Sequence, residues 1–123
     1  MKERNDIKKL FDLWNQSLLT GNPKEMVKHY APDAVLMPTL SNKVRTTPAA
    51  IEDYFVFFLA REPVGHIDES HIQLFGDLAI HSGLYTFTFQ DQTSSQARFS
   101  FVYKKEGKSW LIVEHHSSLM PEG

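Results

Sequence analysis

Residues 97–118 read ARFSFVYKKEGKSWLIVEHHSS, two runs rich in apolar residues joined by the triplet EGK. Apolar and polar side chains that alternate with a period of two are typical of β-strands with one buried face. A short glycine-containing connection between two such runs predicts an antiparallel hairpin. This stretch decides the fold because the pattern continues toward the N-terminus. Residues 66–76 and 78–90 read as two further strands, with turns at Gly76-Asp77 and at 91–95.

The first half of the chain predicts three helices and one strand. Residues 3–20 carry apolar side chains at helical spacing, and Gly21 ends this helix. The pairs Asn22-Pro23 and Thr47-Pro48 each join a capping residue to a proline suited to the first helical turn, so each begins a helix. Residues 34–38, AVLMP, read as a strand. The predicted buried stripes are Ile7, Leu10, Phe11, Trp14, Leu18 and Leu19 in the first helix and Ile51, Tyr54, Phe55, Phe58 and Leu59 in the third.

Composition and length fit one α+β domain over residues 1–123. Hydrophobic residues make up 41% and charged residues 23%, and the net charge is −2, which is no electrostatic footprint for nucleic acid or an anionic membrane. The N-terminal stretch MKERNDIKKLFDLW has no apolar signal core, so we expect a cytoplasmic protein. The absence of cysteine excludes disulfides, thiolate zinc sites and cysteine nucleophiles.

Strand alternation sorts the polar residues of the predicted sheet into two sets. We expect one face to carry the lining of a pocket, with Tyr54 added from the third helix, and the other face to carry an exposed aromatic patch. A lone domain rarely exposes such a patch, so it predicts a homo-oligomer, a homodimer or a larger ring. The expected ligand-binding residues are Tyr54, Tyr85, Arg98, Ser100, His115 and Ser117, and the expected interface residues are Phe99, Phe101, Tyr103, Trp110, Ile112 and His116.

The neighbouring pairs His115-His116 and Ser117-Ser118 do not form one catalytic cluster. The two histidines point to opposite faces of a strand, so they cannot bind one metal ion together, and we expect no metal. His115 and Ser117 share a face but lie about 7 Å apart along a strand, which is too far for a nucleophile and its base. His115 is then either a satisfied buried imidazole or a hydrogen-bonding or acid–base group of the pocket. Arg98 is either an edge arginine paired in solvent or an anion clamp.

Three segments resemble a known family: TTPAAIEDYF at 46–55, GDLAIHSGLYTFTF at 76–89 and ARFSFVYKKEGKSWLIVEHHSSLMP at 97–121. They look like the association (hub) domain of calcium/calmodulin-dependent protein kinase II, and even more like its stand-alone bacterial relatives in the nuclear transport factor 2-like (SnoaL-like) superfamily. The resemblance implies a cone-shaped cystatin-like roll, with three N-terminal helices packed on a curved antiparallel sheet, a pocket that opens into the cone, and dimers or rings of dimers.

In the kinase, arginines on successive strands line this pocket. The matched positions here are Tyr85, Ser100 and Ser117, so those arginines are absent, and Arg98 could supply a single positive charge instead. The resemblance to the stand-alone relatives implies a pocket lined by Tyr85, Arg98, His115 and Ser117.

Three functions remain compatible with the sequence. The first is an oligomeric association-domain-like protein whose pocket binds a small carboxylate-bearing ligand. The second is a cofactor-independent SnoaL-like isomerase, dehydratase or cyclase for a small carbonyl compound, with His115 as acid or base, Tyr85 as donor and Arg98 as stabiliser. The third is a structural oligomer with a vestigial pocket. The expected inner strand faces carry no carboxylate, which disfavours the enzyme unless Asp33 or Asp53 faces inward after a shift of register.

Overall fold

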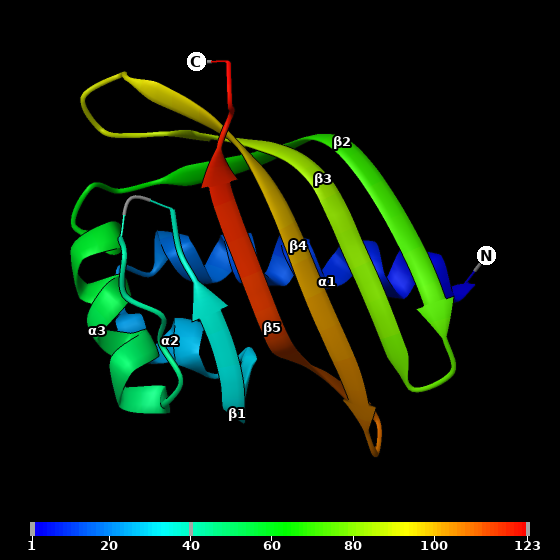
Figure 1. Cartoon of the computed structure of the whole chain (residues 1–123). Helices are drawn as coiled ribbons and strands as arrows, with labels where there is room; N and C mark the ends of the chain where they lie inside the picture. The colour runs from blue at the N-terminus through cyan, green and yellow to red at the C-terminus, as the bar shows by residue number, and fades with distance from the viewer. Residues whose placement is uncertain (1, 40, 123) are drawn as a thin grey trace.

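The computed structural model describes residues 2–39 and 41–122, which form three helices and five strands (Figure 1). Every element predicted from the sequence is present, in the predicted order. The elements are α1 (Lys2–Leu19), α2 (Pro23–Val27), β1 (Tyr30–Met37), α3 (Pro48–Leu59), β2 (Val64–Phe75), β3 (Leu78–Thr88), β4 (Ser94–Glu106) and β5 (Ser109–Leu119).

The strands form one sheet in the order β1-β5-β4-β3-β2. The β2–β3, β3–β4 and β4–β5 pairs are antiparallel, as predicted, but β1 pairs with β5 in parallel. Most of the chain separates β1 from β5, so no hairpin turn fixes their relative direction. Figure 1 shows α1 running across one face of the curved sheet, with α2 and α3 beside β1. We call the face against α1 the inner face and the opposite one the outer face.

Helix α1 covers the inner face because its apolar stripe matches the helical repeat. Ile7, Phe11, Trp14 and Leu18 are buried, whereas Leu19, which we predicted to be buried, is 68% exposed. Trp14 packs edge-on against Phe101 of β4, with ring centroids 5.6 Å apart. Each such buried side chain contributes about 1.5–3 kcal/mol, so this stripe supplies much of the force that holds α1 on the sheet.

The two predicted helix caps are confirmed. The Asn22 side chain accepts a hydrogen bond from the Lys24 backbone N–H at 3.0 Å, and Thr47 accepts one from that of Ala50 at 3.1 Å. Gly21 follows α1 with a φ of +67°, the left-handed conformation that ends helices. The cap at Thr47 fixes the start of α3, which forms one wall of the site described below.

Our assignment of the faces of β4 is wrong. In the observed register Ala97 lies opposite Tyr85, and Phe101 lies opposite His115, and directly paired residues share a face. Phe99, Phe101 and Tyr103 are therefore on the inner face and buried in the core, with Phe101 fully covered. Alternation within one strand yields two sets of side chains but does not say which set meets the helices. That choice depends on the register with the neighbouring strands.

A β-bulge in β5 changes a second assignment. Val102 pairs with Glu114 and Tyr103 pairs with Ile112, so Val113 is an extra residue on β5. The bulge brings Ile112 to the inner face together with His115, and both are buried. Ile112 thus belongs to the core and not to the predicted interface. Of the six predicted interface residues, only Trp110, which is half-buried, and the exposed His116 retain access to solvent.

Candidate functional site

A cavity of about 430 Å³ lies between α3, the inner face of β3–β5 and the segment that follows β1. Its size is in the range of small-molecule sites. Aromatic side chains form most of its walls, and small hydroxyl side chains and two arginines supply the polar part. The aromatic lining residues are Trp14, Tyr54, Phe55, Phe57, Phe58, Tyr85, Phe87 and Phe89.

Four of the predicted ligand-binding residues line this cavity: Tyr54, Tyr85, His115 and Ser117. Tyr85, His115 and Ser117 come together because β4 lies between β3 and β5 with the small residue Ala97 opposite Tyr85. The other two predicted residues, Arg98 and Ser100, do not line the cavity and lie on the outer face with Val102. Their placement in the pocket is wrong for the same reason as the face of β4.

A series of hydrogen bonds determines which ring nitrogen of His115 carries the hydrogen. The Trp14 indole N–H donates to the Tyr30 hydroxyl at 3.2 Å, and the Tyr30 hydroxyl lies 2.8 Å from Nδ1 of His115. The Tyr85 hydroxyl donates to Ser117, so its oxygen accepts from Nε2–H of His115. Nδ1 in turn accepts from the Tyr30 hydroxyl. The neutral imidazole therefore carries its hydrogen on Nε2, which lies 3.3 Å from the Tyr85 hydroxyl.

Ser117 is the last group in this series of hydrogen bonds. The Tyr85 hydroxyl donates to Ser117 Oγ at 2.7 Å, and the Thr39 hydroxyl donates to the same oxygen at 2.5 Å. A serine hydroxyl that accepts twice still has its own hydrogen to donate. Ser117 lines the cavity, so this hydrogen is available to an acceptor on a ligand.

Burial keeps these groups neutral. His115 is only 3% exposed, and desolvation, with a smaller contribution from nearby His116, lowers its pKa to about 3. Burial also raises the pKa of Tyr54 to about 12 and raises that of Tyr85 above its ordinary value. At neutral pH this part of the cavity offers neutral hydrogen-bond donors. Because Nδ1 of His115 is occupied by Tyr30, His115 is poorly suited to act as a base.

Arg45 is a site residue that the sequence analysis missed. Its backbone N–H and C=O pair with those of Leu36 at 2.9 and 2.8 Å, which carries the side chain to the cavity, where the residue is 8% exposed. The guanidinium Nη1 donates to the Ala50 carbonyl and to Asp53, both at 3.1 Å. No local pattern marks this arginine, because its burial comes from backbone pairing with Leu36 of β1.

The charged side chains in the described cavity lining are all positive. Arg45 and Arg61 both contribute, and the Arg61 guanidinium stacks on Phe89 with Cζ 3.7 Å from the ring centroid. Among the lining residues that the structure describes, none is acidic. Asp53 is bound to Arg45 and its side chain is 63% exposed, and Asp33 is exposed on β1, so neither provides the inward-facing carboxylate we considered.

Two further properties bear on the class of site. Within residues 2–39 and 41–122, no group of three His, Asp or Glu side chains is arranged to hold a metal ion. Over the same residues, no helix combines the length and the hydropathy needed to cross a bilayer.

A long helix and two shorter ones around a curved five-stranded sheet, with a cavity between them, define the cystatin-like cone of nuclear transport factor 2-like proteins. Two solved structures share this fold at low sequence identity. One is a nuclear transport factor 2-like protein from Novosphingobium aromaticivorans (TM-score 0.81, 12% identity, 99% of this chain and 84% of that chain). The other is a "putative dehydratase from the NTF2-like family" from Streptomyces avermitilis (TM-score 0.85, 10% identity, 97% and 96%).

Within this class, the chain belongs to the calcium/calmodulin dependent protein kinase II association domain family, whose sequence model matches residues 3–121. It is similar to a solved "putative calcium/calmodulin dependent protein kinase II association domain" from Xanthomonas campestris. The two are 46% identical, with a TM-score of 0.92 over 96% of this chain and 88% of that chain. No curated protein matches the sequence. The resemblance and the fold class predicted from the sequence are thus confirmed.

Proposed function

We propose that this protein is a self-associating association-domain protein whose cavity binds a small organic anion that carries a carboxylate. The observation that carries the proposal is the cavity lining, which combines two guanidinium groups with neutral donors and, among its described members, includes no acidic side chain. A carboxylate is attracted to such a lining and can accept hydrogen bonds from it, whereas a cation would be repelled by the two guanidinium groups and would meet no carboxylate among the described lining residues.

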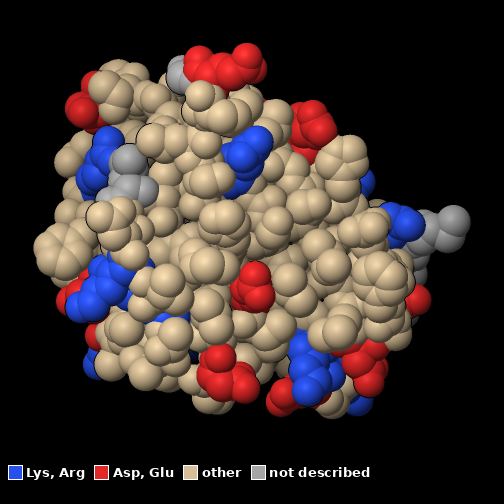
Figure 2. Space-filling view, in the orientation of Figure 1, with Lys and Arg blue, Asp and Glu red and all other residues tan. Residues whose placement is uncertain are grey.

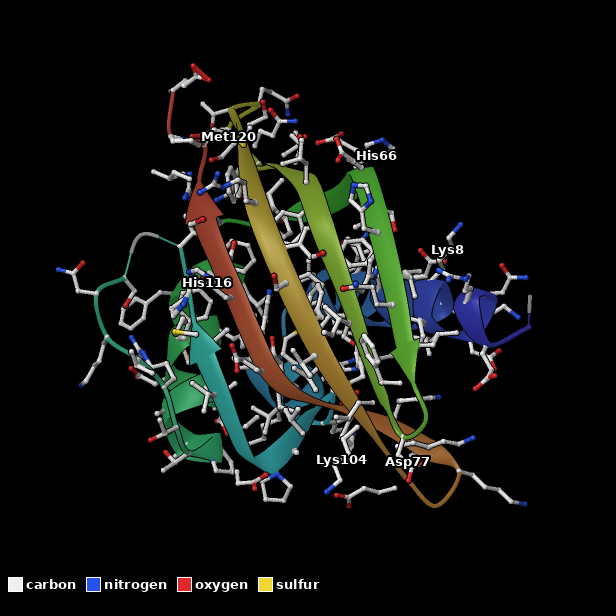
Figure 3. All side chains as sticks on the ribbon, turned by 45° about the vertical axis from the view of Figure 1, so that its right-hand side comes forward. Lys8, His66, Asp77, Lys104, His116 and Met120 are labelled. Atoms are coloured by element: carbon white, nitrogen blue, oxygen red, sulfur yellow. The ribbon has the colours of Figure 1, made fainter. Side chains whose placement is uncertain are left out.

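The outer face of the sheet supports self-association. Ile80, Leu84 and Val102 lie half-buried on it, and no described helix covers it (Figure 1). Serines lie nearby, and the charged residues Arg98 and Glu114 lie opposite Leu84 and Val102. Figure 2, in the orientation of Figure 1, shows a broad uncharged area over the strands with few charged side chains in it. Exposed His116, labelled in Figure 3, pairs with Ser100 on this same face. A surface of this kind on a small domain is typical of an isologous interface between two copies.

The enzyme alternative receives less support from the geometry. An isomerase or dehydratase of this fold needs a group that takes a proton, and His115 has a pKa of about 3 and an occupied Nδ1. The described lining offers no carboxylate in its place. The likeness to the Streptomyces protein, at 10% identity, extends to the fold alone.

The test is a thermal-shift measurement with small carboxylates and their matched amides. We expect at least one carboxylate to raise the midpoint of unfolding by several degrees at a concentration well above its Kd, because binding to the native state stabilises it. The amides should have little effect. Ser95→Phe places a large ring at the half-buried lining position opposite Phe87 and should abolish the shift.

The matched control is Gln96→Phe, which adds the same ring at the next residue, exposed on the other side of β4. It should respond to carboxylates as the wild type does. If no carboxylate stabilises the wild-type protein, or if Ser95→Phe retains the full response, the cavity is not the binding site and the proposal fails.

A further inference from the structure

Resting on the proposed function, we infer that Arg45 is the residue that binds the carboxylate, through the edge formed by Nε and Nη2, and that the rest of the ligand is an aromatic ring. Arg98, which the sequence favoured as the anion clamp, is on the outer face and cannot do this.

The hydrogen bonds of Arg45 leave one edge of its guanidinium without a strong partner. Nη1 has two acceptors, the Ala50 carbonyl and Asp53. Nη2 has only a long contact of 3.5 Å to the Ser41 hydroxyl, and Nε has no hydrogen-bond partner among the described residues. The N–H groups of Nε and Nη2 run parallel on the same edge, which is the arrangement that binds a carboxylate through both oxygens.

An unsatisfied donor at this depth points to a missing partner. Arg45 is buried, and a buried guanidinium N–H without an acceptor destabilises the fold unless something else supplies one. Arg45 belongs to the cavity lining, so that something can be a ligand. The carboxylate of such a ligand would satisfy Nε and replace the weak contact of Nη2.

Arg45 is held in place before any ligand arrives. Its backbone N–H and C=O both form hydrogen bonds with Leu36, and its Nη1 donates to Ala50 and Asp53 in the first turns of α3. A donor that is already oriented loses little conformational entropy on binding, which favours tight and specific recognition. Asp53 compensates part of the charge, but its exposed carboxylate is bound to Nη1 and leaves the other edge unoccupied.

The residues around Arg45 favour a ligand whose remaining part is an aromatic ring. The Tyr54 ring lies 5.9 Å from Arg45 Cζ, and the walls beyond it include Trp14, Phe55 and Phe87. Planar rings pack edge-to-face or offset against such walls with a gain beyond their buried area. A single available guanidinium edge in an apolar cavity suits a monoanionic carboxylate better than a phosphate dianion, which needs more donors.

Arg61 provides the matched comparison. It also lines the cavity, but it is exposed and lies over the ring of Phe89. In water its charge is well solvated, so its attraction for an anion is weak. Arg45→Gln and Arg61→Gln therefore remove the same charge from the same cavity. Only Arg45→Gln also removes the buried edge formed by Nε and Nη2.

The experiment is calorimetric titration of wild type, Arg45→Gln, Arg45→Lys and Arg61→Gln with benzoate, benzamide, cyclohexanecarboxylate and acetate. We expect benzoate to bind more tightly than the other three compounds. Arg45→Gln should weaken benzoate binding by about tenfold to a hundredfold, as expected for lost charge-assisted hydrogen bonds, and Arg45→Lys should weaken it too, because an ammonium lacks this edge of parallel N–H groups. Arg61→Gln should change the Kd by less than about threefold.

A second measurement does not depend on how the variants fold. In ¹H–¹⁵N spectra of the wild-type protein, benzoate should shift the Nε–H signal of Arg45 and leave that of Arg61 nearly unchanged. The inference is overturned if benzoate binding survives Arg45→Gln, if Arg61→Gln abolishes it, or if benzamide, cyclohexanecarboxylate or acetate binds as tightly as benzoate. If no carboxylate binds the wild-type protein at all, the proposed function itself fails, which is a separate result.

Discussion

At the scale of single residues, the centre of the site is His115, held between two tyrosines. Tyr30 fixes its Nδ1 as an acceptor, and Tyr85 lies against its Nε2. The ring of Phe101 stacks on the imidazole with centroids 4.0 Å apart. This environment is apolar apart from the two hydroxyl groups, so it favours the neutral imidazole strongly over the charged one.

The neutral state of His115 predicts a pH dependence of stability. Its pKa is about 3 in the folded protein and 6.5 in the unfolded chain, so the unfolded state takes up a proton first as the pH falls. The free energy of unfolding should be fully retained above pH 6.5 and should fall between pH 6.5 and about 3, by up to about 1.4 kcal/mol per pH unit for this one group. Buried His81, whose pKa burial lowers to about 4, adds to the same slope.

Urea denaturation at several pH values between 7.5 and 4.5 checks this prediction. His115→Gln should reduce the slope by one titrating group, whereas His116→Gln, at the exposed neighbouring position, should keep a slope near that of the wild type. An His115→Gln variant with an unchanged slope would show that the buried imidazole does not titrate as argued.

At the scale of elements, two irregularities shape the sheet. One is the bulge at Val113 described above. The other is a shift of register in β2 between Ile67 and Glu69, which pair with Tyr85 and Leu84 of β3, next to Gly83. Gly83 has a φ of +156°, and a Cβ at this position would lie 2.0 Å from the backbone oxygen of Glu69. The two strands can approach this closely only because residue 83 is glycine.

Gly83→Ala should therefore be strongly destabilising, by about 2 kcal/mol or more. The backbone conformation is unfavourable for alanine, and the new methyl group would clash with the backbone oxygen of Glu69. Gly76→Ala is the matched control. Gly76 also has a positive φ, of 63°, but a Cβ there meets no atom within 4 Å, so the cost should be near 1 kcal/mol. Thermal or urea unfolding of the two variants measures the difference, and equal losses would contradict the argument from close approach.

At the scale of the whole molecule, the helices cover one face of the sheet and leave the other open. The inner face encloses the core and the cavity, and the outer face is the surface we propose for self-association. Val102 lies half-buried near the middle of the sheet, between Ile80 of β3 and Glu114 of β5.

Self-association through the outer face predicts the effect of a new charge there. The wild-type protein should scatter light as a dimer or a larger assembly, and Val102→Glu should shift it toward the monomer, because an unpaired carboxylate would be buried twice in a two-fold interface. Val44→Glu adds the same charge on an exposed residue outside the sheet and should not change the mass. A monomeric wild-type protein would rule out the interface.

What the sequence determined by itself is the set of elements and much of the family relation. The helices and strands follow from local periodicity and from caps such as Thr47, interactions that span a few residues. The sequence also identified four residues of the cavity. Alternation within one strand placed Tyr85 on its face and placed His115 and Ser117 together on theirs, and Tyr54 was added from the third helix.

Only the tertiary structure decided which side of β4 meets α1, and with it the position of Arg98, Ser100, Phe99, Phe101 and Tyr103. It also decided that the bulge at Val113 turns Ile112 inward and that Arg45 reaches the cavity. The physical reason is the same in each case. Register, bulges and the burial of an arginine beside Leu36 depend on hydrogen bonds between different segments of the chain, and the pattern of residues within one segment does not show which residues of another will pair with it.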